Sequence, residues 1–185
     1  MIDEILADGE DRMKKTVEAV QRELTAIRTG HAHVGLVDHV RVEYYGSLLP
    51  VNQMATVAAP EARLLTIQPW DRGALSAIEK ALLKSDLGLT PSNDGQIIRL
   101  AIPPLTEQRR KELIKVVHKR VEDGHVAVRN VRRDCLEHLR RLVHEKQVSE
   151  DDQHKAQDQL QKLTDRYVAQ IDQRGREKEA ELTEV

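Results

Sequence analysis

The sequence predicts an α+β fold, mainly α: a long antiparallel three-helix bundle with a small β/α/β domain inserted into it. Apolar residues recur at steps of three and four over residues 1–30 and again over residues 105–185. This spacing is that of helices with one apolar stripe. Residues 31–104 instead contain short alternating runs separated by Gly, Asn and Pro, which is typical of strands and turns.

The first helix is predicted within residues 1–30. Its apolar stripe comprises Ile2, Leu6, Met13, Val17, Val20, Leu24 and Ile27. Gly9 interrupts this stripe at a local cost in helix stability. The helix should end at Arg28, Thr29 and Gly30, because Gly readily takes the left-handed conformation that commonly follows a last helical turn.

Three strands and one covering helix are predicted for residues 31–104. The strands are expected at 39–46, 63–69 and 96–103. Residues 71–86 have helical spacing at Leu75, Ile78, Leu82 and Leu83, and Asp71 is placed to cap the start of that helix. We expect Trp70 to close the core of this domain, although an exposed Trp could instead bind a partner.

Two long helices are predicted after the prolines at 103 and 104. The first should begin after Thr106 and continue to about Glu145, with the stripe Leu113, Val117, Val121, Val128, Val131, Cys135, Leu139 and Leu142. A break at 147–149 follows, where Ser149 can cap the last helix. The stripe of the last helix comprises Ala156, Leu160, Leu163, Tyr167, Ile171, Lys178 and Leu182.

Each long helix needs more apolar cover than one partner offers, so the first helix is the third member of the bundle. Residues 1–30 and 105–185 are therefore predicted to form the bundle, and residues 31–104 the inserted domain. Two connections join the domains, and we expect them to act as a hinge. The hinge residues are Thr29, Gly30, His31, Pro103, Pro104 and Leu105.

The composition excludes several classes of protein. Cys135 is the single cysteine, so no internal disulfide can form and we expect a cytoplasmic protein. No run of about 18 apolar residues predicts a membrane span, and the acidic start of the chain is unlike a secretory signal. Aromatic residues make up 2% of the chain, too few for a base-stacking platform.

Enzyme and metal chemistry have little support in the sequence. The chain has no GxSxG motif and no phosphate-binding Gly-rich loop, so we expect neither an enzyme nor a cofactor. His31, His33 and His39 invite a metal hypothesis, but no Cys or carboxylate completes a recognisable ligand set. We expect no metal site, and a metal-dependent enzyme stays an alternative that metal analysis after dialysis would test.

Positive charge is concentrated in one predicted helix. Residues 106–146 contain 12 Lys and Arg against 7 Asp and Glu, whereas residues 147–185 contain 6 against 10. On a helix, Arg129 and Arg133 lie within about 40° of each other, and Arg132 lies between them and the apolar stripe. Arg132 should therefore extend from the edge of the core with its guanidinium outward.

These arginines allow two interpretations. Arg suits bidentate binding of phosphate, so RNA or another polyanion is a candidate partner. Alternatively, the arginines form a solvated face that pairs with acidic neighbours such as Asp134 and Glu137. We consider the charge undercompensated, because only Asp134 lies close to the three arginines in the sequence.

Six stretches together resemble the ribosome recycling factor family and occur in the family's order. They are IRTG (27–30), VEYYG (42–46), AIEKALLKSDLGLTPSNDG (77–95), IPPLTEQRRKEL (102–113), VAVRNVRRD (126–134) and VSEDDQHKAQDQLQKLTD (148–165). The resemblance implies an L-shaped molecule of roughly tRNA dimensions. It also implies a monomer that binds the ribosome after termination and, with elongation factor G, splits the subunits so that mRNA and tRNA leave.

The resemblance further implies a contact between the tip of the bundle and large-subunit ribosomal RNA. Carried onto this chain, Arg132 is the first candidate for that contact and Arg129 lies beside it. Arg110, Arg133 and Arg28 are expected to support them. An adaptor that binds protein partners through its helical bundle is the alternative, and it would self-associate and ignore ribosomes.

One position departs from the family's pattern. Where the family commonly has RTGRA, this chain has RTGHA, with His31 in place of Arg, and Val34 stands where Pro is frequent. Since an imidazole carries only part of a charge near neutral pH, a fixed ionic contact at His31 is in doubt. Otherwise His31 is a neutral surface residue.

Overall fold

The computed structural model describes residues 1–184, which form two compact units. The first comprises Met1–Arg28 and Glu107–Val185, and the second comprises Thr29–Thr106. Both boundaries lie within two residues of the sequence-based division. No helix in the described part of the chain is long and apolar enough to cross a membrane.

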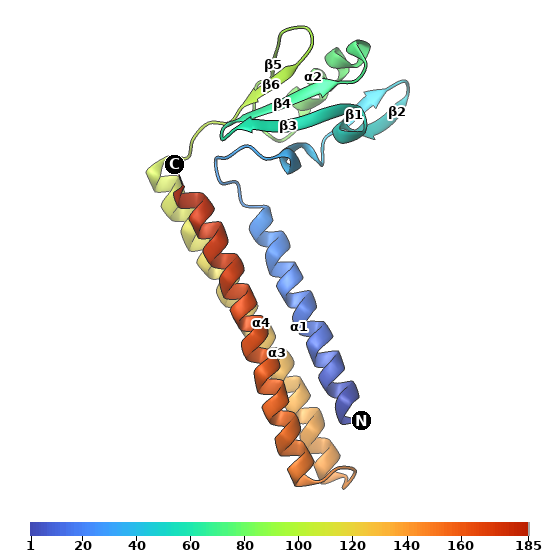
Figure 1. The fold of residues 1–185 in the computed structure, drawn as a ribbon, viewed down its shortest axis with the longest axis vertical. Helices are drawn as coiled ribbons and strands as arrows, with labels where there is room; N and C mark the ends of the chain where they lie inside the picture. Colours follow the sequence, from blue (N-terminus) through green and yellow to red (C-terminus); the bar gives the residue numbers. More distant parts are fainter. Residues whose placement is uncertain (185) are drawn as a thin grey trace. The chain divides into compact units, whose positions relative to one another are not determined.

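The first unit is a bundle of three helices (Figure 1). They are α1 (Ile2–Thr25), α3 (Glu107–His144) and α4 (Glu150–Thr183). Helix α3 runs antiparallel to the other two, and each helix packs against both others (Figure 1). The 38 residues of α3 make a rod of about 57 Å.

The predicted stripes form the core of this bundle. Met13, Val17, Val20 and Leu24 of α1 are buried, as are most stripe residues of α3 and α4. Only Lys178 brings a charge into a stripe, and its side chain is 11% exposed and pairs with Glu181 at 3.4 Å. The mainly α fold class is thereby confirmed.

Glycines bring the three helices unusually close together. A Cβ added to Gly9 of α1 would lie 2.7 Å from Cys135 Sγ of α3, and one added to Gly175 of α4 would lie 2.5 Å from Val121 Cγ2. A Cβ at Gly124 of α3 would lie 2.8 Å from Val20 Cγ2. The glycine in the first stripe is therefore a point of close packing between helices.

The helix ends differ in part from the prediction. Helix α1 ends at Thr25, and Gly30, with φ of 76°, comes four residues after the right-handed cap Ala26. Helix α3 ends in a Schellman motif, in which Lys146 takes φ of 58° and Gln147 N–H donates to Leu142 C=O at 2.9 Å. The predicted cap of α4 is confirmed, because Ser149 Oγ accepts from Asp152 N–H at 3.1 Å.

The second unit contains a four-stranded antiparallel sheet in the order β3-β4-β6-β5 (Figure 1). These strands are β3 (Ala55–Glu61), β4 (Leu64–Pro69), β5 (Ser92–Asn93) and β6 (Ile98–Ala101). Helix α2 (Leu75–Lys84) shares the core with β4 and β6. Asp71 caps the short 3₁₀ turn Arg72–Ala74 that leads into α2, by accepting from Gly73 N–H.

A separate hairpin adds β1 (Arg41–Tyr44) and β2 (Ser47–Pro50). Its two-residue turn has positive φ at both Tyr45 and Gly46, the geometry of a type I′ turn. The sequence predicted strands at the positions of β1, β4 and β6, and it missed β2, β3 and β5. Ala and Pro in β3 and Pro in β2 weaken the strand signal there.

Two side chains predicted to face the core of the second unit lie outside it. Trp70 is 66% exposed and its indole donates to Thr56 Oγ1 at 2.9 Å, so it does not close the core. Leu83 is 59% exposed, because it follows Leu82 on α2 and points about 100° away from it.

Candidate RNA-binding face

Arg129, Arg132 and Arg133, here called the arginine cluster, lie in the second half of α3. Val128, Val131 and Cys135, which lie before, between and after these arginines, are buried in the bundle. Arg129 and Arg133 are exposed, while Arg132 is half-buried. Arg132 therefore extends from the edge of the core, as its position relative to the stripe predicts.

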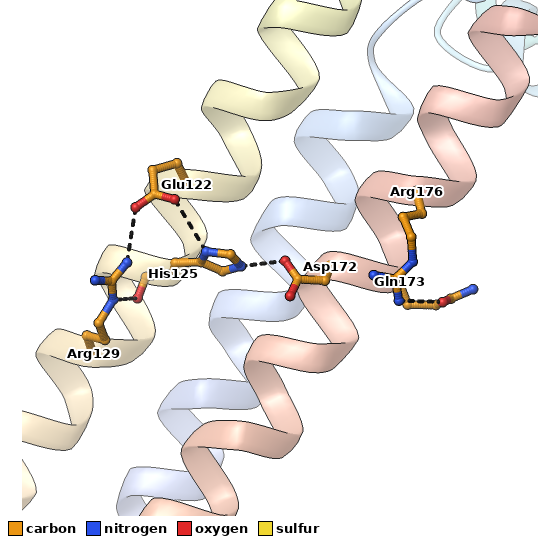
Figure 2. Close-up of polar contacts among 6 residues, drawn as sticks. All are labelled: Glu122, His125, Arg129, Asp172, Gln173 and Arg176. Carbon is orange, nitrogen blue, oxygen red and sulfur yellow. Dashed lines mark hydrogen bonds and ion pairs between the residues drawn. The ribbon is translucent and has the colours of Figure 1, made fainter.

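Arg129 is neutralised by a carboxylate that the sequence analysis did not consider. Its Nη2 donates to Glu122 Oε1 at 3.0 Å, and its Nε donates to His125 C=O at 3.3 Å. Figure 2 shows Glu122 between Arg129 and His125, whose Nδ1 lies 3.4 Å from Glu122 Oε2. The expectation that only Asp134 lies near the cluster was wrong, because residues 122 and 129 are two helical turns apart and share a face.

His125 extends this network to the neighbouring helix. Its side chain is 18% exposed, and its Nε2 lies 2.6 Å from Asp172 Oδ1 of α4 (Figure 2). The imidazole thus links two helices of the bundle one turn before Arg129. Glu122 and the carbonyl of His125 hold the side chain of Arg129 in place. The pair of Arg129 and Glu122 has little net charge.

Arg132 and Arg133 hydrogen bond to neutral groups instead. Arg132 Nη1 donates to Gln161 Oε1 of α4 at 3.0 Å, and Arg133 Nη2 donates to Asn130 Oδ1 at 3.0 Å. Arg132 Nε is buried and has no hydrogen-bond partner among residues 1–184. Because an amide leaves the guanidinium charge uncompensated, these two arginines keep two positive charges at the surface of the bundle.

Asp134, the acidic neighbour in sequence, is held by another residue. Arg12 Nη2 of α1 donates to Asp134 Oδ2 at 2.9 Å. This ion pair links α1 to α3 and engages the carboxylate of Asp134. Within residues 1–184, neither Asp134 nor Glu137 forms an ion pair with the cluster, and the one carboxylate that does is Glu122.

Arg110 and Arg28 lie in the same unit but far from the cluster. Arg110 precedes Arg132 by 22 residues on α3, a rise of about 33 Å. Like Arg132, it is half-buried with an Nε that has no partner in the described chain. Arg28 is exposed and follows the end of α1. The five predicted arginines thus do not form one site.

The predicted hinge residues lie at the two ends of the second unit. Gly30 and Leu105 are in contact, since a Cβ on Gly30 would lie 3.2 Å from Leu105 N. The two connections therefore run side by side. Beyond them, Ala32 N–H donates to Ala62 C=O at 2.8 Å and Ile102 N–H donates to Arg63 C=O at 2.9 Å.

The histidines of the second unit have local roles. His33 Nδ1 accepts from Gly35 N–H at 3.1 Å, and His39 Nε2 lies 2.9 Å from Asp86 Oδ1. Within residues 1–184, no three His, Cys, Asp or Glu side chains gather in a group that could hold a metal ion. Cys135 is buried, and burial raises the pKa of its thiol.

Within the described residues, Arg132 and Arg133 thus lie without a counter-charge on a long helix of the bundle. Comparison with known proteins assigns the chain to a family. The family model described as ribosome recycling factor matches residues 20–183. The chain belongs to the ribosome recycling factor family. Members of this family are translation factors that act by binding, so the chain is not an enzyme.

Relatives and solved structures agree with this assignment over the full length. The chain is 52% identical to the ribosome-recycling factor of Thermomicrobium roseum, with 100% of both chains covered. A solution structure of a ribosome recycling factor matches with a TM-score of 0.81 and 42% identity, covering 100% of this chain and 98% of that one.

A second matching structure gives models of such a factor bound to a ribosomal complex. It describes the Thermus thermophilus ribosome recycling factor and the Escherichia coli elongation factor G bound to the E. coli post-termination complex. The recycling factor in it is 45% identical, with a TM-score of 0.67 and full coverage of both chains.

Sequence reasoning missed the residues that surround the arginine cluster in space. Gln161 and Arg12 come from α4 and α1, and no local pattern connects them to α3. Glu122 could have been found, because its seven-residue distance from Arg129 is a two-turn helical spacing.

Proposed function

We propose that this chain recycles ribosomes after termination. It binds the post-termination ribosome and, together with elongation factor G, splits the subunits so that mRNA and tRNA are released. Membership of the ribosome recycling factor family supports this proposal, as does the relative bound with elongation factor G to a post-termination complex. The proposal places the protein in the cytoplasm, as a monomer without a membrane contact.

The arginine cluster is the part of the bundle that contacts large-subunit ribosomal RNA in this proposal. The observation that carries it is the pair Arg132 and Arg133, whose side chains bond only to amides within residues 1–184. Phosphate binding exchanges water for a charge-assisted contact and breaks no ion pair at these two residues. Arg129 must first give up Glu122, so its contribution should be smaller.

Arg110 and Arg28 contribute as more distant contacts. Their distance from the cluster means that they would meet a different segment of RNA. Arg110 resembles Arg132 in its half-buried stem and its unpartnered Nε, which suits a side chain whose guanidinium donates outward.

The mechanical step uses the hinge, which consists of Thr29–His31 and Pro103–Leu105. Gly30 supports this role, because its φ of 76° is strained for any residue with a Cβ. Two parallel connections bend more readily than they twist. With His31 in place of the family's Arg, the hinge lacks a fixed positive charge at that position.

Cosedimentation with ribosomes tests the proposal against the adaptor hypothesis. The purified chain is centrifuged through sucrose with empty 70S particles at a series of salt concentrations. We expect the chain to bind ribosomes. The logarithm of its binding constant should fall linearly with the logarithm of the salt concentration, with a slope of about 0.7 to 0.9 per phosphate contacted. Self-association without ribosome binding would instead support an adaptor and refute the proposal.

A further inference from the structure

The hydrogen bonds around Arg132 continue through a second residue of the neighbouring helix. Gln161 accepts from Arg132 through Oε1 at 3.0 Å and donates through Nε2 to Asp165 Oδ1 at 2.9 Å. Because a carboxylate accepts only, Asp165 requires the NH₂ end of the Gln161 amide to face it. The amide oxygen must then face Arg132.

We propose that Gln161 and Asp165 are positioning residues for Arg132: they hold its guanidinium in the orientation that binds ribosomal RNA. This inference rests on the proposed function of the arginine cluster. It adds two residues of α4, neither of which needs to touch RNA. The relay comprises Arg132, Gln161 and Asp165.

An amide is suited to this task for an electrostatic reason. A carboxylate at position 161 would hold the guanidinium equally well but would neutralise its charge, as Glu122 does for Arg129. Gln161 fixes one N–H of the guanidinium and leaves its full charge for a phosphate. Asp165 bonds to the amide of Gln161, and no ion pair joins it to Arg132 in the described chain.

Because Arg132 is half-buried, one hydrogen bond to Gln161 is enough to fix the orientation of its guanidinium. The side chain is half-buried and its Nε lies inside without a partner, so packing restrains the stem and Gln161 restrains the tip. Nη2 and the second N–H of Nη1 are left to donate to RNA. Without Gln161 the tip would have to be ordered on binding, which costs about two- to tenfold in affinity for one long side chain.

The test measures the affinity of full-length variants for isolated large subunits over a series of salt concentrations. Gln161→Leu should bind about two- to tenfold more weakly with an unchanged salt slope, because the charge at Arg132 remains. Gln161→Glu should also reduce the slope by about 0.7 to 0.9, the value of one lost phosphate contact. Asp165→Asn can donate as well as accept, so it no longer requires the NH₂ end of Gln161 to face it. This variant should bind more weakly than wild type with an unchanged salt slope, and wild-type affinity would refute the positioning role of Asp165.

Helix α4 offers a matched control. Gln173 accepts from Arg176 Nη2 at 3.0 Å and donates to Glu177 Oε1 at 3.1 Å (Figure 2 shows the first bond). This triad has the same chemistry on the same helix but includes no proposed RNA contact. Gln173→Leu and Gln173→Glu should therefore match wild type in affinity and slope.

Arg132→Ala separates the two levels of the proposal. In one outcome, the salt slope of Arg132→Ala falls by the value of one phosphate contact while both Gln161 variants bind like wild type. That result refutes the relay, but the RNA contact of Arg132 stands. If Arg132→Ala itself keeps the wild-type affinity and slope, the RNA contact of Arg132 is refuted. Gln161 is exposed, and equal thermal melting of its variants and wild type excludes a loss of folding as the cause.

Discussion

Replacing Gly124 with Ala tests the close packing of the bundle beside the arginine cluster. The new Cβ would lie 2.8 Å from Val20 Cγ2 of α1 and 3.2 and 3.3 Å from two carbons of Ile171 of α4. Both neighbours are buried and β-branched, so their rotamers on a helix have little freedom. The helices must therefore move apart.

The expected loss of stability follows from two opposing effects. Ala favours a helix over Gly by about 1 kcal/mol, whereas overpacking a core costs about 1 to 3 kcal/mol. Because two helices resist the new methyl group, we place the packing cost near 3 and the net loss near 2 kcal/mol. For a unit of roughly 100 residues this lowers the melting temperature by about 8 to 16 °C.

Calorimetry or circular dichroism of the bundle's melting transition gives the answer. Val126→Ala is the matched control, because Val126 is 47% exposed on the same helix and its change should stay within about 0.5 kcal/mol. The double variant Gly124→Ala with Val20→Ala should recover part of the loss. A Gly124→Ala protein as stable as wild type would refute the argument that the helices touch at this glycine.

Three further predictions concern acid stability, the thiol and the hinge. Backbone N–H groups of Ile97 and Gln96 and then Arg99 lower the pKa of Asp94 from 3.8 to about 2; its stabilising effect is present above pH 4 and lost as pH falls through 2. The melting temperatures of wild type and Asp94→Asn should therefore converge between pH 5 and about 2, and a constant difference would contradict this. Cys135 should react with a thiol reagent far more slowly in the native than in the unfolded protein, since its thiol is buried with a raised pKa; equal rates would show an open bundle. Gly30→Pro forces φ from 76° toward about −65° and should lower the rate of ribosome recycling more than ribosome affinity, whereas equal losses would argue against a mechanical hinge.

The helical part of the fold was predictable because each helix has a continuous apolar stripe. Periodicity located α3 and α4 and the break between them, and Ser149 marked the start of α4. The end of α1 was less predictable, since Gly30 suggested a helix cap but instead has its left-handed conformation in the connection. A single glycine does not distinguish a helix cap from a later turn.

The sheet was harder to predict because its pairing depends on contacts between distant residues. Strand β3 consists largely of Ala, Thr, Pro and Glu and shows no clear alternation. Trp70 is exposed although a large apolar side chain is expected in the core. Its indole bonds to Thr56 of β3, a strand that was not predicted from the sequence. Resemblance to a family supplied the architecture, but not these side-chain positions.

The arginine cluster was predictable as a local excess of charge, but its compensation was not. Glu122 and Asn130 on α3 and Gln161 on α4 bond to the cluster, whereas Arg12 on α1 binds the nearby Asp134. In the folded bundle Arg129 forms an ion pair with Glu122, whereas Arg132 bonds to the neutral amide of Gln161. The structure thereby ranks arginines that the sequence leaves equal.

Ribosome splitting by Arg132→Ala tests the RNA contact of this arginine. Post-termination ribosomes are mixed with the variant, elongation factor G and GTP, and dissociation into subunits is followed by light scattering. We expect the variant to split ribosomes at least tenfold more slowly than wild type, the loss of about one charge-assisted bond, with unchanged circular dichroism and melting. Wild-type splitting by a folded Arg132→Ala protein would contradict the central claim that this uncompensated arginine binds ribosomal RNA.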